Sequence, residues 1–271
     1  MPEVTVVIPC YCCVKTIERA VASVYTQTLR PAEIILVDDC SFDKTLDKLR
    51  EIKEYYPPGW VKVIELPRNV GPGEARNAGW EAATHPYIAF LDADDSWHTQ
   101  KIEIQYGWMS EHPEVSLTGH AFRQIHADRE RAVCVNFKRE NAFFTPVFKR
   151  QLLLSNYFST PTVMMRRDLP MRFAKGKRFC EDYLLWCEIC CAKLSCYYCE
   201  LPLTYLYKDA YGAGGLSGDL RKMQNGELEV YRRLYQDKCY GMWSFLFLAS
   251  FSHLKYFRRI LKTKFFRSGA L

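Results

Sequence analysis

Acidic residues follow two short apolar runs of this chain. They are Asp38 and Asp39 after residues 33–37, and Asp92, Asp94 and Asp95 after residues 87–91. Continuous apolar runs of this length are typical of buried parallel strands, and open α/β sheets bind ligands beyond the carboxyl ends of such strands. Crowded carboxylates repel one another unless a cation or hydrogen-bond donors lie among them. A divalent ion that holds a diphosphate fits, because Mg²⁺ is usually held by one or two carboxylates and phosphate oxygens.

The first hundred residues alternate between strand and helix patterns. Strands are predicted near 4–8, 33–37, 61–65 and 87–91, and helices near 14–27, 43–55 and 73–84. Asp43 is the predicted N-cap of the second of these helices. Repeated β-α units imply a mostly parallel sheet with right-handed crossovers. The later pattern is mixed, with helices near 99–111, 146–154 and 181–194 and strands near 115–124, 132–137, 162–165 and 196–200.

Composition sets further bounds on the class of protein. The chain has 271 residues, 48% of them hydrophobic, which suits one large or two small, closely packed domains. The N-terminus runs directly into a strand pattern, so we expect no secretion signal and twelve reduced thiols in a cytosolic protein. Residues 238–271 contain seven Lys and Arg and no acidic residue, so the net charge of +6 belongs to the tail. The balanced body argues against a nucleic-acid-binding surface.

Glycine-rich phosphate loops are absent from the sequence. The turn after the first strand reads Pro9-Cys-Tyr-Cys-Cys-Val14 instead of Gly-x-Gly-x-x-Gly, and no Walker A segment occurs. The glycine-rich loop of sugar nucleotidyltransferases is missing as well. A bound diphosphate would therefore be held mainly through a metal ion at Asp92 and Asp94.

Five motifs occur in a fixed order along the chain. They are Val6-Val-Ile-Pro-x-Tyr11, Val37-Asp-Asp-x-Ser41, Asn69-x-Gly-x-x-x-Ala-Arg-Asn-x-Gly79, Leu91-Asp-x-Asp-Asp95 and Glu181-Asp-Tyr-x-x-Trp186. Each is weak alone, but together they resemble glycosyltransferase family 2, the inverting enzymes of the GT-A fold, over roughly residues 4–210. The resemblance implies transfer of a sugar from a nucleoside diphosphate donor to a hydroxyl group, with inversion at the anomeric carbon.

The resemblance implies roles for the donor-side residues. The backbone from Pro9 to Tyr11 and the Asp39 carboxylate would hold the base, with Tyr11 stacked on its ring. An Asp that accepts the imide N–H selects uracil or thymine over cytosine. Asp94 would be the direct ligand of Mg²⁺ or Mn²⁺, with Asp92 nearer the ribose or a metal-bound water. The ion would neutralise charge as the nucleoside diphosphate leaves.

Two further residues complete the implied site. Asp182 would be the general base that takes the proton of the acceptor hydroxyl as its oxygen attacks the anomeric carbon. Arg76 would face the donor, against a carboxylate or the diphosphate. Structural alternatives remain open, because a carboxylate in a first helical turn also caps a helix. Arg76 would then lie on a helix surface, and Asp39 would be a turn or N-cap carboxylate.

Cysteines raise two separate questions. Cys12 replaces the Asn that the family usually has after the first-strand Tyr, so the first turn is expected to be held differently. The pairs Cys187-x-x-Cys190 and Cys196-x-x-Cys199 make an awkward zinc site, because the second pair lies in a predicted strand whose residues three apart point to opposite faces. Buried thiols are the better interpretation.

Two segments beyond the motifs also suggest functions. The glycine-rich stretch 207–217 is expected to be either a mobile lid over the donor or a plain loop. Residues 242–251 are apolar but too short to span a bilayer, and the six basic residues from Lys255 to Arg267 alternate with aromatic ones. Such a segment is typical of a helix in an anionic membrane interface. A helix that packs on the catalytic domain is the alternative.

The sequence therefore predicts an α/β protein of the GT-A fold. A mostly parallel, Rossmann-like nucleotide-sugar-binding half (1–95) would join a mixed half for the acceptor and catalytic base (96–218) and a helical, basic tail (219–271). The predicted activity is metal-dependent transfer of a hexosyl group from a UDP-sugar, or a dTDP-sugar, to a lipid-linked saccharide of a surface polysaccharide. The enzyme would attach peripherally to the inner face of the plasma membrane. The alternatives are transfer to a polyprenyl phosphate and a non-catalytic GT-A binding module.

Overall fold

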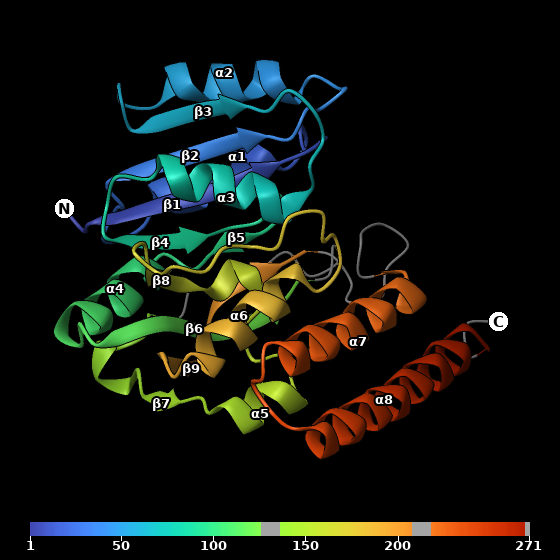
Figure 1. The fold of residues 1–271 in the computed structure, drawn as a ribbon. Coiled ribbons are helices and arrows are strands. Elements are labelled where there is room, and N and C mark those ends of the chain that lie inside the picture. The colour runs from blue at the N-terminus through green and yellow to red at the C-terminus, as the bar shows by residue number, and fades with distance from the viewer. Residues whose placement is uncertain (126–135, 208–217, 269–271) are drawn as a thin grey trace.

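The described strands form one mixed sheet with helices on both faces (Figure 1). The computed structural model describes residues 1–125, 136–207 and 218–268, with side chains as far as Leu261. The strands are β1 Val4–Cys10, β2 Glu33–Asp38, β3 Val61–Glu65, β4 Tyr87–Phe90, β5 Ser96–Trp97, β6 Val115–Gln124, β7 Phe144–Pro146, β8 Met164–Arg166 and β9 Ser195–Leu206. Their order across the sheet is β3-β2-β1-β4-β8-β6-β9-β5, with β7 paired to β9.

The helices enclose two apolar cores, one on each face of the sheet. They are α1 Ile17–Tyr25, α2 Thr45–Tyr55, α3 Pro72–Ala82, α4 Lys101–Glu111, α5 Lys149–Leu154, α6 Glu181–Cys191, α7 Leu220–Gln236 and α8 Met242–Ser268, with short 3₁₀ helices η2 Arg139–Asn141 and η3 Thr160–Thr162. One core contains side chains of α1, α2 and α4, and the other contains side chains of α3, α5, α6 and α7. Val6 and Ile8 of β1 lie in the first core and Val7 in the second, because successive strand residues face opposite sides.

The predicted α/β architecture is confirmed. Strand β1 pairs in parallel with β2 and β4, and β2 pairs in parallel with β3. Both β1 and β2 are buried along nearly their whole length, which accounts for their unbroken apolar sequences. In the second half β8 is antiparallel to β4 and β6, while β6 and β9 are parallel. Because β4 pairs with β8, both halves belong to one sheet. Residues from both halves can therefore meet at one site.

The irregular segments differ most from the sequence-based expectations. The strand expected at 132–137 falls outside the described residues except for its last two, which are not in a strand. The helix expected at 146–154 begins later, because β7 pairs with β9 at that point. The N-cap residue of α2 is Lys44 and not Asp43. Asp43 still stabilises this helix end, because its Oδ1 accepts the Thr45 N–H at 3.0 Å.

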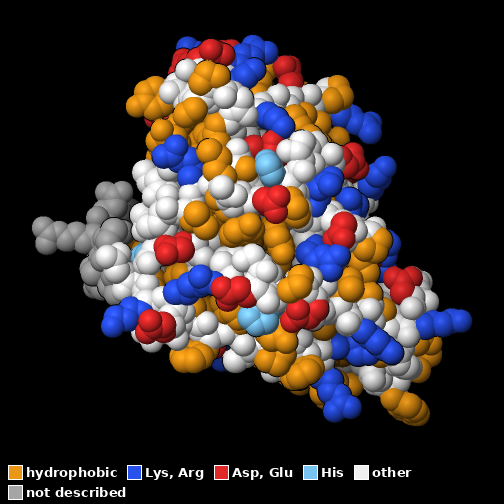
Figure 2. Space-filling view, turned by 90° about the vertical axis from the view of Figure 1, so that its left-hand side faces the viewer, with side chains coloured by type: hydrophobic (Ala, Val, Ile, Leu, Met, Phe, Trp, Pro, Cys, Tyr) orange, Lys and Arg blue, Asp and Glu red, His pale blue; other side chains and the backbone are white. Residues whose placement is uncertain are grey.

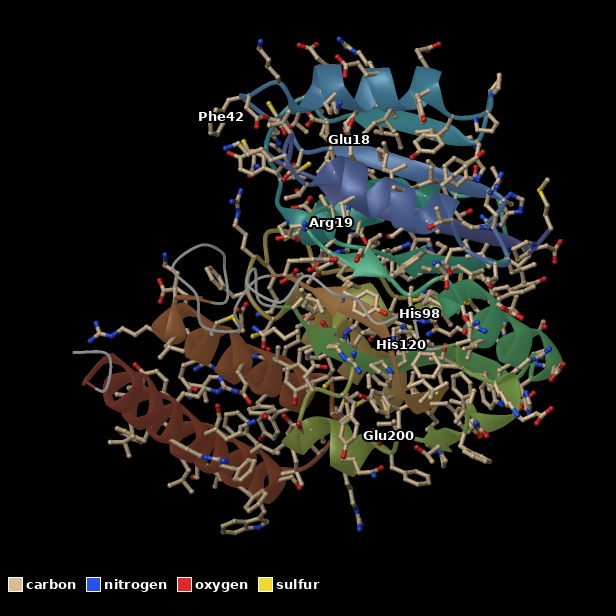
Figure 3. The ribbon with its side chains drawn as sticks, turned by 180° about the vertical axis from the view of Figure 1, so that it is seen from behind. Glu18, Arg19, Phe42, His98, His120 and Glu200 are labelled. Carbon is tan, nitrogen blue, oxygen red and sulfur yellow. The ribbon has the colours of Figure 1, made fainter. Side chains whose placement is uncertain are left out.

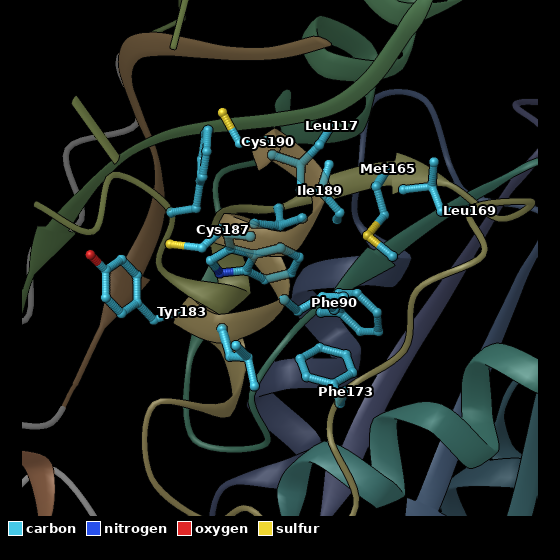
Figure 4. Packing of buried hydrophobic residues seen from close by; sticks show 14 of the residues in the cluster. Phe90, Leu117, Met165, Leu169, Phe173, Tyr183, Cys187, Ile189 and Cys190 are labelled. Carbon is cyan, nitrogen blue, oxygen red and sulfur yellow. The ribbon is translucent and has the colours of Figure 1, made fainter. Parts of the chain in front are cut away.

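Helix α6, which carries the predicted general base Asp182, is anchored in the core (Figure 4). Its Trp186 is fully buried, with the ring centroid 5.9 Å from that of Phe173. Cys187 and Cys190 on the same helix are buried free thiols. The described residues contain no group of three or more Cys, His, Asp or Glu arranged to hold a metal ion. The packing therefore fixes the position of the first turn of α6 relative to the sheet.

The C-terminal tail folds as the two helices α7 and α8, which pack against each other (Figure 1). Helix α7 also contacts α6. No helix in the described part of the chain is long and apolar enough to cross a membrane. On the face drawn in Figure 2, basic and acidic side chains are interspersed, as the balanced charge of the body leads us to expect.

Candidate functional site

A cavity of about 700 Å³ lies at the carboxyl ends of β1, β2 and β4. All seven residues that the sequence singled out line it: Pro9, Tyr11, Asp39, Arg76, Asp92, Asp94 and Asp182. A volume of this size is within the range of small-molecule sites. Asn69, Thr160, Arg178 and Glu181 also line it, although sequence reasoning gave them no role. The structure thus brings together carboxylates and arginines from both halves of the chain.

Hydroxyl groups of the β2–α2 connection hold the turn after β1. The N–H groups of Cys12 and Cys13 donate to Ser41 Oγ at 3.0 Å and Thr45 Oγ1 at 2.9 Å. Cys12 has φ +49°, in the left-handed region where Asn is among the best-tolerated residues other than Gly. The family preference for Asn therefore matches the backbone here. In this chain the turn keeps that conformation with a thiol, supported by the two backbone hydrogen bonds.

Tyr11 lies at the mouth of the cavity. Its side chain is 48% exposed, and its ring meets that of Phe42 edge-on, with 6.0 Å between the centroids. Phe42 itself is 84% exposed and projects from the β2–α2 connection (Figure 3). A flat, accessible ring at this place suits the stacking role that the resemblance implies.

Asp39 anchors the loop before α3. Its carboxylate accepts the N–H groups of Val70 at 2.7 Å and Gly71 at 2.8 Å, and its carbonyl accepts Asn69 Nδ2 at 3.1 Å. Burial raises the pKa of Asp39, and the two backbone amides act against that rise. The turn role is therefore present in the structure. Each carboxylate oxygen has a second lone pair, so Asp39 can also accept a hydrogen bond from a base. That contact stays a prediction.

Arg76 is buried and joins the two halves of the site. It is 5% exposed, so the surface alternative is wrong. Its Nη2 lies 2.7 Å from Asp92 Oδ1, and its Nη1 lies 3.1 Å from Glu181 Oε1. The sequence left a carboxylate or the diphosphate open as the contact of Arg76, and it did not indicate that Glu181 is one of two carboxylate partners. Burial, followed by the nearby Asp182, raises the pKa of Glu181 to about 7, and Arg76 opposes this rise.

Asp182 is held on both carboxylate oxygens. Its Oδ2 accepts the Thr160 hydroxyl at 3.1 Å, and its Oδ1 accepts the Tyr183 N–H at 2.7 Å. Burial raises the pKa of Asp182, while the charge of Arg76 is the largest opposing influence. A more basic carboxylate with a fixed orientation is suited to accept a proton from a ligand in the cavity. The first turn of α6 therefore presents an oriented carboxylate to the cavity in addition to any role at the helix end.

The Asp92-x-Asp94 segment follows β4 directly. Arg19 of α1 donates from Nη2 to the Asp94 carbonyl, and its guanidinium lies 3.6 Å from the ring centroid of Tyr207 (Figure 3). This contact ties the backbone of the acidic segment to α1. The donor set of two carboxylates on a cavity fits Mg²⁺ or Mn²⁺, which need few protein ligands when a diphosphate supplies oxygens. The stretch 207–217, predicted as a lid or a plain loop, lies outside the described residues apart from Tyr207.

Comparisons with known proteins identify the family of this chain. The family model "Glycosyl transferase family 2" matches residues 5–171, more than half of the chain. An uncharacterized glycosyltransferase of Haemophilus influenzae is 30% identical over 191 residues, which cover 69% of this chain and 72% of that protein. The UDP-Glc:alpha-D-GlcNAc-diphosphoundecaprenol beta-1,3-glucosyltransferase WfaP of Escherichia coli is 39% identical over 111 residues, covering 40% of this chain and 42% of that protein.

Solved structures show the same fold at lower identity. S. aureus TarS 1–349 in complex with UDP-GlcNAc has a TM-score of 0.65 at 19% identity, covering 86% of this chain and 66% of that chain. Mannosyltransferase PcManGT from Pyrobaculum calidifontis, in complex with GDP-Man and Mn²⁺, has a TM-score of 0.67 at 18% identity, covering 94% and 71%. With its five motifs, its GT-A fold and these matches, the chain belongs to glycosyl transferase family 2.

Proposed function

We propose that this glycosyltransferase moves a hexosyl group from a UDP-sugar to a hydroxyl of a lipid-linked saccharide, with inversion, in surface polysaccharide synthesis. The observation that carries the proposal is that one cavity is lined by all the predicted site residues: Tyr11 and Asp39 at one end, the Asp92-x-Asp94 segment, and Asp182. A donor laid along this cavity would place its base near Tyr11, its diphosphate near the acidic segment and its sugar near Asp182.

The reaction requires the protein to accept one proton. The acceptor oxygen forms a bond to the anomeric carbon, the bond from that carbon to the diphosphate oxygen breaks, and the hydroxyl proton passes to the Asp182 carboxylate. The Thr160 hydroxyl and the Tyr183 N–H orient this carboxylate. Arg76 forms ion pairs with both Asp92 and Glu181 and so fixes the positions of these two carboxylates. Preorganised groups of this kind need little rearrangement during the reaction.

A divalent ion is part of the proposal. Asp94 and Asp92 would hold Mg²⁺ or Mn²⁺, and the ion would stabilise negative charge on the leaving nucleoside diphosphate. PcManGT, which shares the fold, is in complex with Mn²⁺. Without the ion, the negative charge of the acidic segment would repel a diphosphate. Arg76 neutralises only part of this charge, through its ion pair with Asp92.

The choice of base rests on Asp39. An anchored carboxylate accepts the imide N–H of uracil or thymine but finds no proton at N3 of cytosine. TarS in complex with UDP-GlcNAc and WfaP, whose donor is UDP-Glc, agree with uracil. PcManGT carries GDP-Man on the same fold, so the fold alone does not select the base. A dTDP-sugar, which presents the same imide, is the second donor class.

The proposed acceptor is a saccharide on a lipid diphosphate, as named for WfaP. Sugar supplied as radiolabelled UDP-sugar to the enzyme and a membrane extract should enter the organic phase. Mild acid should then release the label as an oligosaccharide. Release as a monosaccharide would instead favour transfer to a polyprenyl phosphate, and absence of label from lipid would contradict both. The non-catalytic alternative has little support, because Asp94 and Asp182 are both present on the cavity.

Helix α8 supports a membrane-bound location. Its face toward α7 combines polar pairs with packed apolar side chains. Lys255 Nζ pairs with the buried Glu227, and Ser252 Oγ lies 3.2 Å from Gln224 Oε1. Beside them Leu248 is buried in the core, and the ring of Phe245 stacks on that of Tyr235 of α7. The opposite face is apolar and exposed: Trp243 85%, Phe247 60%, Leu254 67%, Phe257 59% and Leu261 57%. The spacing of three, four or seven residues puts these side chains on one stripe. We call these five residues the α8 stripe.

A lipid surface is the proposed partner of the α8 stripe. Residues 238–271 carry basic but no acidic side chains, and each Lys or Arg near an anionic surface contributes about 1 kcal/mol to binding. Aromatic and aliphatic side chains add burial in the interface. The enzyme would thus lie on the inner face of the plasma membrane, where a lipid-linked acceptor is within its reach.

Vesicle sedimentation tests the membrane proposal. The wild type should sediment with anionic phospholipid vesicles at low salt and be released in part at high salt. Leu254→Glu with Phe257→Glu should abolish sedimentation and leave UDP affinity unchanged. Tyr55→Glu, an equally exposed change on α2, is the control and should sediment normally. A wild type that ignores the vesicles but forms a dimer through the stripe would contradict the membrane assignment.

A further inference from the structure

Arg178 reaches from the catalytic half to the base end of the cavity. It lies in the segment between β8 and α6, and its Nη2 donates to Asn69 Oδ1 at 2.5 Å in the donor half. Its Cγ lies 3.4 Å from the place that a Cβ on Gly71 would occupy, and Gly71 has φ +94°. A residue without a side chain at position 71 therefore lets the Arg178 side chain lie flat against this loop.

The Arg178 charge lies beside the two residues predicted to hold the base. Burial raises the pKa of both Tyr11 and Asp39, and the positive charge of Arg178 lowers both. Asn69 links the set, because its Nδ2 donates to the Asp39 carbonyl while its Oδ1 accepts from Arg178. The base end of the cavity thus holds a fixed carboxylate acceptor and a guanidinium donor side by side.

Arg178 keeps hydrogen-bonding capacity for a ligand. A guanidinium has five N–H donors in a rigid plane. Within the described residues, the hydrogen bonds of the Arg178 side chain go from Nη2 to Asn69. The side chain is exposed and lines the cavity. Other N–H groups of the same plane are therefore available toward the cavity.

We propose that Arg178 is a specificity-determining residue that donates to the O4 carbonyl oxygen of the donor's uracil while Asp39 accepts the N3–H. This inference rests on the proposed use of a UDP-sugar. Uracil presents a donor at N3 between two carbonyl acceptors, which matches an Asp beside an Arg. Cytosine presents an acceptor at N3 and an amino donor next to it, so both contacts are lost and polar groups stay unpaired. Thymine shares the pattern of uracil.

Nucleotide titrations of Arg178→Ala and Arg178→Lys test the inference. Wild type, variants and the control Lys175→Ala, which removes an exposed charge from the same segment, are titrated with UDP, UMP and CDP in Mn²⁺. Arg178→Ala should weaken UDP and UMP by about tenfold and leave CDP nearly unchanged. Arg178→Lys keeps the charge but lacks the planar fork, so it should also lose preference for uracil. Lys175→Ala should behave as wild type.

The outcomes separate this inference from the proposed function. Equal weakening of UDP and CDP would mean that Arg178 attracts the diphosphate, and unchanged UDP binding would mean that it contacts no ligand. Either result overturns the inference. A wild type that binds no uridine nucleotide at all would instead contradict the proposed UDP-sugar donor.

Discussion

Replacing Asp182 with Asn is expected to reduce sugar transfer by about 10²–10⁴-fold, the usual contribution of a positioned general base. UDP affinity should stay within a few-fold of wild type. The amide has nearly the same size and can keep one of the two hydrogen bonds from Thr160 and Tyr183, but it cannot take the acceptor proton. Initial rates with saturating donor, beside UDP titrations of the same preparations, measure the two effects.

The pH dependence of the same enzyme gives an independent check. Burial raises the pKa of Asp182, and the base must be ionised to accept a proton. The transfer rate of the wild type should therefore reach its maximum above this raised pKa and fall as the pH drops through it. The residual rate of Asp182→Asn should not show this fall at acidic pH.

Two variants of α6 serve as controls for Asp182. Glu188→Gln removes a charge on the same helix at a residue that does not line the cavity, and it should keep wild-type rates. Glu181→Gln tests whether the neighbouring carboxylate is the base, since its pKa is also raised by burial. Near wild-type transfer by Asp182→Asn, with a large loss in Glu181→Gln, would assign the proton to Glu181.

Asp94→Ala is expected to remove the metal dependence of donor binding. In the wild type, Mn²⁺ or Mg²⁺ should tighten UDP binding relative to chelator, and the variant should show the chelator value in both conditions. Transfer should fall by at least about 10²-fold, because Lewis-acid stabilisation is worth several kcal/mol. Titration calorimetry measures the affinity difference directly.

Asp47→Ala is the matched control for the metal prediction. Its carboxylate is exposed on α2, away from the cavity, and its removal should leave the metal effect intact. If wild-type UDP affinity is the same with metal and with chelator, Asp92-x-Asp94 does not hold a cation in this protein.

The sequence predicted the donor half well because its signals are local. The apolar runs of β1, β2 and β4 and the acidic residues after them appear within a few positions, and the parallel pairing follows from the repeated β-α units. The seven predicted site residues all line one cavity: six belong to this half, and Asp182, which the family resemblance indicated, comes from α6. A strand end and a helix start are features that short sequence patterns report.

Other parts of the site depend on contacts far apart in the chain. Arg76 and Glu181 are 105 positions apart, and Arg178 lies in a segment without regular structure that has no periodic pattern. Thr160 likewise comes from a single 3₁₀ turn. Position in the sequence does not indicate that these side chains meet at the cavity, because tertiary packing brings them there.

Helix α8 shows a different limit of the sequence. Its composition is compatible with both a membrane helix and a packing helix, and in the structure it packs on α7 through both polar pairs and the apolar Phe245 and Leu248. The reason lies on α7, where the buried Glu227 needs the charge of Lys255. Which face of an amphipathic helix turns inward thus depends on the partner helix, and here the apolar face is left exposed.

Turnover of a nucleotide-sugar panel tests the central claim most directly. Wild-type enzyme with lipid-linked saccharide and Mn²⁺ should release nucleoside diphosphate from a UDP-sugar or a dTDP-sugar, and chelator should stop the release. GDP-sugars and CDP-sugars should give no release above the level of Asp182→Asn. Release from none of the donors, or release from GDP-sugars or CDP-sugars instead, would contradict the account.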